Sequence, residues 1–227
     1  TLKKGVFGAE RECLITDERM TLASMLRDQG YATAMVGKWH LGFGDAHGPA
    51  AHGFDHSLAF FSWSIDYFSH RTPSGEPGLF ANGKPVELAG YSTDVFSERS
   101  TSFIREHADH PFFAYVAFNA SLPPQQPPDR PEDVLADGRG AVPGAVWHRG
   151  SRADYVKVVE SLDAGIGRRL ETLESAGLAE KTLVIFTYDH GGMWLVRHSP
   201  LSGGFATLSE GGIRVPCIMR CPDLLPA

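Results

Sequence analysis

A lysine and a histidine flank one tryptophan in the run Gly37-Lys38-Trp39-His40-Leu41-Gly42. A lysine ammonium supplies a fixed positive charge, and an imidazole can transfer a proton near neutral pH. Glycines at both ends of the run allow the backbone to approach a ligand closely. The run therefore predicts a local anion-binding site. A simple surface turn is the alternative.

A second candidate is Asp189-His190-Gly191-Gly192, which directly follows an apolar segment. A carboxylate and an imidazole side by side are typical of a divalent-metal site. Calcium would prefer oxygen ligands, whereas the histidine nitrogen favours zinc or manganese. The alternative is a turn in which Asp189 caps a helix.

Three further sequence patterns are weaker indications of a functional site. The histidines His47, His52 and His56 have spacings that could suit a metal, but no ligand motif flanks them. Asn119-Ala120-Ser121 fits the acceptor motif for N-glycosylation. The segment 202–207 is rich in glycine but lacks the lysine and spacing of a phosphate-binding loop.

Composition narrows the possible classes of protein. The chain has 227 residues, of which 42% are hydrophobic and 21% charged, as in an ordinary globular protein. A net charge of -6 provides no broad basic surface, so we expect no nucleic-acid partner. We also expect no membrane span, because no apolar run reaches about 18 residues. The 3 cysteines have no metal-ligand spacing and predict no disulfide framework.

Helix and strand patterns alternate along the chain. This order predicts an α/β fold with a largely parallel central sheet and helices on both faces. Ligands in such sheets bind beyond the carboxyl ends of the strands, so the two candidate sites should face one cleft. Long irregular segments are expected at 43–90 and 121–150. The expected helices are 21–29, 94–107 and 152–175, and the expected strands are 32–36, 112–118, 183–188 and 215–219.

The segment Gly30–Gly42 closely resembles the second signature of the sulfatases, in the alkaline phosphatase superfamily. Further sulfatase-like segments follow in the family's order, at 52–55, 111–120, 182–192 and 208–216. The resemblance implies an alkaline phosphatase-like fold, incomplete at both ends. It also implies that residues 1–227 are one partial sulfatase catalytic domain.

The resemblance also implies a chemistry and a set of residue roles. Sulfatases cleave sulfate esters of small molecules or glycans with a formylglycine nucleophile and a divalent metal, usually calcium. Lys38 should contact the sulfate or the nucleophile, and His40 should orient or deprotonate the nucleophile. Asp189 should bind the metal, and His190 should be a ligand at a position where asparagine is common. Family members are often secreted, periplasmic or lysosomal.

The chain departs from the family pattern in several places. The nucleophile motif Cys/Ser-x-Pro/Ala-x-Arg is not found, because Leu-Ile-Thr-Asp follows Cys13 and neither Cys217 nor Cys221 fits. The paired N-terminal aspartates of the metal site are missing too. Leu122 aligns with the family's substrate-facing histidine, and Phe205 aligns with its sulfate-binding lysine. We therefore expect this chain to be inactive on its own.

Three functions remain open at this point. The favoured one is a metal-dependent sulfuric ester hydrolase. The second is a phosphodiesterase or phosphonate hydrolase of the same superfamily. The third is a non-catalytic sulfatase-like binding protein, which Leu122 and Phe205 favour because they place apolar groups where the family has polar ones.

Overall fold

The computed structural model describes residue 15 and residues 19–225. The chain divides into two compact units, Thr1–Thr172 and Leu173–Ala227, and each is described by itself. Among the described helices, none has the length and apolar character needed to cross a membrane.

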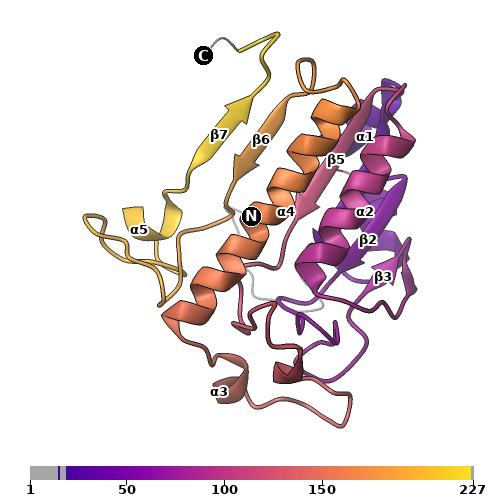
Figure 1. Ribbon diagram of the computed structural model, residues 1–227. Helices are drawn as coiled ribbons and strands as arrows, with labels where there is room; N and C mark the ends of the chain where they lie inside the picture. The colour runs from indigo at the N-terminus through magenta and orange to yellow at the C-terminus, as the bar shows by residue number, and fades with distance from the viewer. Residues whose placement is uncertain (1–14, 16–18, 226–227) are drawn as a thin grey trace. The chain divides into compact units, whose positions relative to one another are not determined.

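The first unit is built on a five-stranded sheet with the order β4-β3-β2-β1-β5 (Figure 1). Strand β1 pairs in parallel with β2 on one edge and with β5 on the other. The two short outer strands pair antiparallel, so the sheet is mixed around a parallel centre. The strands are β1 (Ala32–Lys38), β2 (His56–Phe60), β3 (Phe80–Ala81), β4 (Lys84–Pro85) and β5 (Phe112–Ala117).

Three of these strands lie inside the segment 43–90, which was expected to be irregular. That expectation was wrong for β2, β3 and β4. The outer strands β3 and β4 are two residues long each, too short to give a periodic sequence pattern. Strand β2 follows directly after the turn at Gly53, and its burial on both faces hides any alternation of polar and apolar residues.

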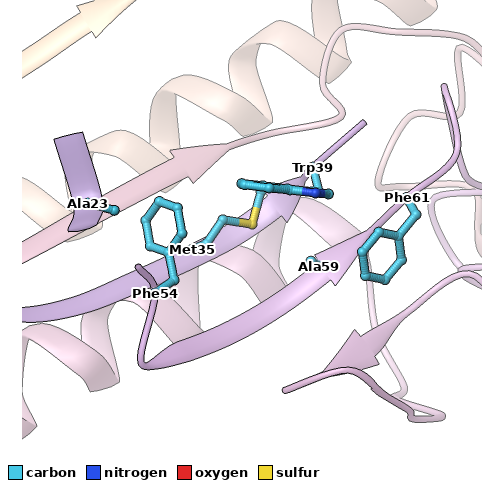
Figure 2. Close-up of a cluster of buried hydrophobic side chains, with 6 residues drawn as sticks. All are labelled: Ala23, Met35, Trp39, Phe54, Ala59 and Phe61. Carbon is cyan, nitrogen blue, oxygen red and sulfur yellow. The ribbon is translucent and has the colours of Figure 1, made fainter. Parts of the chain in front are cut away.

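Helices cover both faces of the parallel centre, as predicted. Met35 lies in a cluster with Ala23 of helix α1 (Leu22–Asp28), which Figure 2 shows at the side-chain level. The next residue, Val36, lies in a different cluster with Phe96 of helix α2 (Ser92–Glu106). Successive side chains of a strand point to opposite faces, so the two helices lie on opposite sides of the sheet.

The helix boundaries follow local chemistry. Thr21 caps α1 in a capping box with Ser24, at the residue where the helix was expected to begin. Helix α4 (Arg152–Ser175) has the predicted bounds. Its Val158 and Leu162 pack in a cluster with residues from the loops that leave β2 and β5. The described part of the first unit also contains the short helical turns η1 (Asp45–His47), η2 (Pro49–His52), η3 (Pro131–Asp133) and α3 (Gly144–Trp147).

The second unit contains β6 (Val184–Thr187), α5 (Glu210–Ile213) and β7 (Cys217–Arg220). Both strands were expected, within a largely parallel sheet. Instead β6 pairs antiparallel with β7, and its residues alternate between half-buried and exposed. The apolar run at 183–186 therefore indicated a strand correctly but not its partner.

Gly37 is required where β1 passes β5. Its φ is +105°, and a Cβ built there would lie 2.0 Å from the carbonyl oxygen of Ala117. No larger residue fits without separating the two strands. Gly30 provides a matched comparison, because its φ is +85° but nothing lies within 4 Å of its Cβ position.

We predict that Gly37→Ala lowers the free energy of unfolding by about 3 kcal/mol or more, because backbone strain and overpacking act together. Gly30→Ala should cost about 1–2 kcal/mol, from backbone strain alone. Urea denaturation of both variants measures the difference. Equal losses would show that the β1–β5 approach tolerates a side chain.

Candidate functional site

The turn between Lys38 and His40 is held in place by the tryptophan between them. Trp39 is 6% exposed and lies in the cluster that joins α1 to the sheet. Its indole N–H donates to the carbonyl oxygen of His47 at 2.8 Å, and its ring stacks on His52 with centroids 5.6 Å apart. Lys38 and His40 are both half-buried on either side of this anchor.

His40 has a left-handed backbone conformation, with φ at +52°. Such a conformation is uncommon for a residue other than glycine, and it occurs disproportionately at functional sites. The register of β1 pairs Lys38 with Phe60 of β2, so the turn begins at the carboxyl edge of the sheet. This is the edge at which ligands of α/β sheets bind.

The three histidines considered for a metal have structural environments instead. His52 is 2% exposed and stacks on Trp39. The Nδ1 atom of His47 lies 3.2 Å from the Ile15 carbonyl oxygen. His56 packs against the rings of Phe103 and His107. Among the described residues, no group of three or more His, Cys, Asp or Glu side chains could hold a metal ion. The spacing of these histidines was therefore misleading.

The loop after β5 carries Leu122 to the same edge. The hydroxyl of Tyr67 donates to the carbonyl oxygens of Asn119 at 3.1 Å and Leu122 at 3.0 Å. Burial raises the pKa of Tyr67 well above its usual value, so the hydroxyl keeps the proton that it donates. Leu122 itself is half-buried.

Asn119 is fully buried, and its Oδ1 accepts a hydrogen bond from the Ser92 hydroxyl at 3.0 Å. A buried amide is inaccessible to a glycosylating enzyme. The acceptor motif at 119–121 is therefore not usable in the folded chain.

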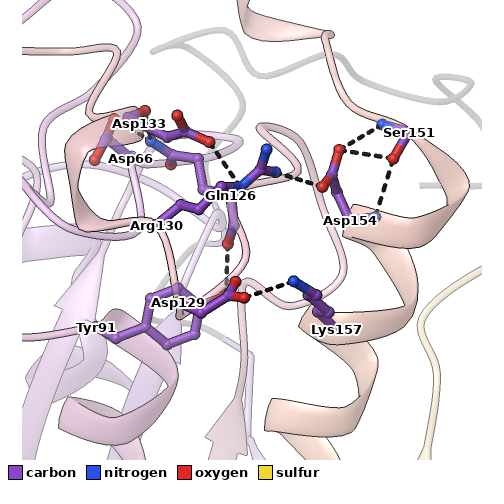
Figure 3. A network of polar contacts seen from close by, with 9 residues as sticks. All are labelled: Asp66, Tyr91, Gln126, Asp129, Arg130, Asp133, Ser151, Asp154 and Lys157. Atoms are coloured by element: carbon purple, nitrogen blue, oxygen red, sulfur yellow. Dashed lines mark hydrogen bonds and ion pairs between the residues drawn. The ribbon is translucent and has the colours of Figure 1, made fainter.

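A buried carboxylate joins the loops beyond β2 and β5. Asp66 is fully buried, and its Oδ1 accepts from the backbone N–H groups of Phe68 and Ser69, both at 2.9 Å. Its Oδ2 accepts from the Gln126 amide at 2.9 Å (Figure 3). The same oxygen accepts from the Leu135 N–H at 2.7 Å. The Ala136 N–H adds a contact at 3.2 Å. Asp66 thus fixes the loop after β2 to the loop that follows Leu122.

Ion pairs extend this network to α4, as Figure 3 shows. Arg130 bonds to Asp133 at 3.1 Å and to Asp154 at the start of α4. Burial opposes ionisation of Asp154, but hydrogen bonds from Ser151 and the charge of Arg130 outweigh it and hold the pKa of Asp154 below its usual value. Lys157 reaches Asp129 at 2.5 Å.

Asp66 belongs to none of the motifs predicted from the sequence, although a local signal marks it. It is the one charged residue in the run 60–69, where every other residue is aromatic, isoleucine or serine. A lone carboxylate in such a run must be paired or hydrogen-bonded if the run is buried.

The second unit places Asp189 and His190 directly beyond β6. The Asp189 Oδ2 lies 3.6 Å from the His190 Nε2. The Nδ1 of His190 lies 2.8 Å from the Gly191 carbonyl oxygen and donates to it, so Nε2 is the ring nitrogen that could bind a metal beside Asp189. Metal–ligand bonds are about 2.0–2.6 Å, so two donors at this separation suit one cation. A carboxylate oxygen and an imidazole nitrogen are suitable ligands for a divalent metal. These two atoms are fewer than the four or more ligands that such a metal takes, so they form part of a coordination shell.

Phe205 packs on this pair. Its ring centroid lies 4.6 Å from that of His190, and its backbone N–H donates to the Gly192 carbonyl oxygen at 3.0 Å. Close glycine contacts create this arrangement, since a Cβ at Gly191 would lie 1.9 Å from the Gly211 carbonyl oxygen. Segments 189–192 and 203–212 are thereby held together within the second unit.

The predicted site residues fall in two groups. Lys38, His40 and Leu122 belong to the first unit, where two loops bring them to one sheet edge. Asp189, His190 and Phe205 belong to the second unit and contact one another there.

Comparison with known proteins identifies the family. The sulfatase family model matches residues 7–227. The chain belongs to the sulfatase family. The resemblance drawn from its sequence motifs is therefore confirmed, and its fold is the α/β, alkaline phosphatase-like fold of sulfatase structures.

Individual relatives agree with this assignment. The chain is 28% identical to an arylsulfatase of Klebsiella aerogenes, over 79% of this chain and 49% of that protein. It is 28% identical to the N-acetylgalactosamine-6-sulfatase of Canis lupus familiaris, over 94% of this chain and 42% of that protein. The chain thus spans less than half the length of these two sulfatases.

Among solved structures, Ps i-CgsB superposes with a TM-score of 0.81 at 28% identity, covering 96% of this chain and 51% of that chain. The same protein in complex with k-i-k-neocarrahexaose gives a TM-score of 0.77 at 27% identity, with 94% and 51% covered. This sulfatase chain is therefore similar in structure to a protein that binds an oligosaccharide.

We predict that Asp66→Ala lowers the free energy of unfolding by about 3 kcal/mol or more, because several buried donors lose their charged acceptor. Asp94→Ala is the matched control. Asp94 pairs with Arg168 at 2.5 Å but its side chain is 55% exposed, so the loss should stay below about 1 kcal/mol. Chemical denaturation of both variants tests this, and similar losses would remove Asp66 from its central role.

Proposed function

We propose that the whole protein hydrolyses sulfate esters. The observation that carries this proposal is the position of the Lys38-Trp39-His40 turn in a chain of the sulfatase family. The turn lies at the carboxyl edge of the parallel strands, and the burial of Trp39 fixes it there. The buried tryptophan fixes the backbone on both sides, so the lysine and histidine need little ordering when a substrate binds. Preorganised charge of this kind stabilises transition states because it needs no reorganisation during reaction.

In this proposal Lys38 and His40 have separate roles. The Lys38 ammonium contacts the sulfate or the nucleophile, where it offsets developing negative charge. The His40 imidazole orients or deprotonates the nucleophile, since its ordinary pKa is close to neutral.

Asp189 and His190 are the residues of this chain that would hold a divalent metal, and we propose calcium as that metal. Such an ion would polarise the sulfate and neutralise part of its charge. The 3.6 Å separation of the Asp189 Oδ2 and His190 Nε2 atoms, with Nδ1 engaged by the Gly191 carbonyl oxygen, supports their part in binding it.

A sulfated sugar is the substrate class we favour. The N-acetylgalactosamine-6-sulfatase of Canis lupus familiaris and the oligosaccharide complex of Ps i-CgsB support this choice. A phosphodiesterase or phosphonate hydrolase is the alternative within enzymes, because a lysine and a metal would bind phosphorus esters as well.

A non-catalytic binding protein is the second candidate, and two contacts favour it. Leu122 places an apolar side chain at the sheet edge beside the Lys38 turn. Phe205 covers one side of His190 with an aromatic ring instead of supplying a cation. Efficient sulfate ester hydrolysis by the whole protein would exclude this candidate.

We predict that the 227-residue chain alone shows no formylglycine-dependent turnover. Formylglycine arises from a cysteine or serine in a motif that this sequence does not contain, and nucleophilic catalysis needs that group. The measurement is release of 4-nitrophenol from its sulfate ester, with the phosphate ester and a phosphonate ester assayed in parallel. Sulfate turnover above the buffer rate would contradict the prediction.

We predict that Lys38→Ala in the whole protein lowers kcat/KM for 4-nitrophenyl sulfate by about 10²–10³, the usual cost of one preorganised stabilising group. Lys84→Ala is the control, because Lys84 is exposed on the outer strand β4. Steady-state kinetics with sulfate and phosphate esters measure both effects. Sulfate hydrolysis that survives Lys38→Ala unchanged would remove Lys38 from the mechanism, and a preference for phosphate would favour the phosphodiesterase alternative.

A further inference from the structure

We propose that Trp63, His148 and Arg149 form a binding surface for the sugar part of a sulfated glycan. This inference rests on the proposed function, because it names where the carbohydrate around the sulfate would be held. The three residues come from two loops of the first unit and are defined here as the aromatic-arginine surface.

The position of the surface follows from strand register. The backbone N–H of Trp39 donates to the Phe60 carbonyl oxygen at 2.9 Å, so β2 ends beside the Lys38 turn. Trp63 lies three residues further along the chain, within about 10 Å of that end at ~3.3 Å per residue. The next residue, Ser64, donates its hydroxyl to the Pro123 carbonyl oxygen, directly after Leu122.

The second loop is anchored at the same edge. Trp147 of α3 is fully buried and contacts Trp63 edge to face, with centroids 6.1 Å apart. Gly150 packs on Gln125, because a Cβ there would lie 2.4 Å from the Gln125 Cβ. The loop 144–150 thus lies against the loop that carries Leu122. In Figure 1, α3 lies toward the end of the sheet to which the β5 arrow points.

The chemistry of the surface suits a sugar. Trp63 is half-buried, and His148 is exposed and stacks on it with centroids 5.5 Å apart at 11° between planes. Aromatic rings offer flat apolar faces to the C–H groups of sugar rings, and indole adds a polar edge. The Trp63 indole N–H has no acceptor within the described part of the chain, so it remains available to a hydroxyl.

Arg149 supplies the charge that a sulfated sugar requires. Its side chain is exposed and forms no ion pair or side-chain hydrogen bond with any residue that the structure describes. Other arginines nearby are paired, as Arg130 is with Asp133 and Asp154. A planar guanidinium can bind a sulfate group through two hydrogen bonds. A stacked aromatic pair, with an exposed arginine next in sequence to one of its rings, therefore fits a sulfated sugar better than a neutral aryl group.

The test measures binding of a sulfated galactan hexasaccharide to the purified chain by isothermal titration calorimetry, which needs no turnover. We expect Trp63→Ala and Arg149→Ala each to raise Kd by about tenfold or more, as for loss of a charge-assisted hydrogen bond or an aromatic contact. Arg139→Ala is the matched control. Arg139 is exposed in the same connecting segment and pairs with Asp137 at 3.1 Å, so its loss should leave Kd within about twofold.

Two further measurements sharpen the result. Trp63→Phe keeps a ring against Trp147 and should raise Kd by a few-fold while preserving the fold, which circular dichroism checks. Desulfated hexasaccharide should bind more weakly to the unmodified chain, and its affinity should depend on Trp63 but not on Arg149.

The proposal is overturned if the unmodified chain does not bind the sulfated hexasaccharide, or if Trp63→Phe and Arg149→Ala both leave Kd within twofold. It is also overturned if the variants weaken binding of 4-nitrophenyl sulfate as much as that of the glycan, because the surface would then serve the sulfate group alone. Failure of the proposed function looks different, since glycan binding would depend on these residues while the whole protein hydrolyses no sulfate ester.

Discussion

The parallel pairing of β1 with β2 and β5 is the constraint on which the first unit depends. Parallel strands end at a common edge, so the loops after Lys38, Phe60 and Ala117 all begin there. The contact between Gly37 and Ala117 fixes how closely β1 approaches β5. Trp39 then inserts into the core directly beyond the strand, and its burial determines where Lys38 and His40 lie.

The loops beyond this edge are long, and hydrogen bonds rather than secondary structure order them. Asp66 accepts hydrogen bonds from four backbone N–H groups and from the Gln126 side-chain amide. The Tyr67 hydroxyl donates to the carbonyl oxygens of Asn119 and Leu122. A fully buried carboxylate is stable only when its lone pairs are satisfied. The bonds of Asp66 therefore fix Gln126 and the segment 135–136, and the adjacent Tyr67 positions Leu122.

The sequence predicted the elements that have a strong local pattern. The stripe of α4, the Thr21 cap and the apolar run of β1 all depend on neighbours within one turn or one strand. The sequence did not predict β3 and β4, because two-residue strands exist only through their pairing partners. It also favoured a parallel setting for β6, which pairs antiparallel with β7, since a run of apolar residues does not specify strand direction.

The candidate site shows the same division. Lys38, His40, Asp189 and His190 were singled out by residue type and by their place at glycine-flanked strand ends. Their sulfatase roles were inferred from the family motifs, and the family model matches this chain. Asp66 and Trp63 belong to no motif, and the contacts that they make join loops that are distant in sequence. Such contacts depend on the complete fold, so the local pattern of the run 60–69 indicates only that Asp66 must be paired or hydrogen-bonded and not with which residues.

The two substituted positions differ in how the surrounding structure holds them. The hydrogen bonds of Leu122 involve its backbone only: its carbonyl oxygen accepts from the Tyr67 hydroxyl, and its N–H donates to the Asn119 carbonyl oxygen. They therefore constrain the loop and not the side chain. A histidine could occupy that position without breaking any of them. Phe205 instead uses its side chain, because its ring packs on His190. A lysine there would lose that ring contact, and its charge would oppose a metal ion held by His190 and Asp189. The apolar ring is thus compatible with a ligand role for His190, and the cost of the missing cation would fall on sulfate binding rather than on metal binding.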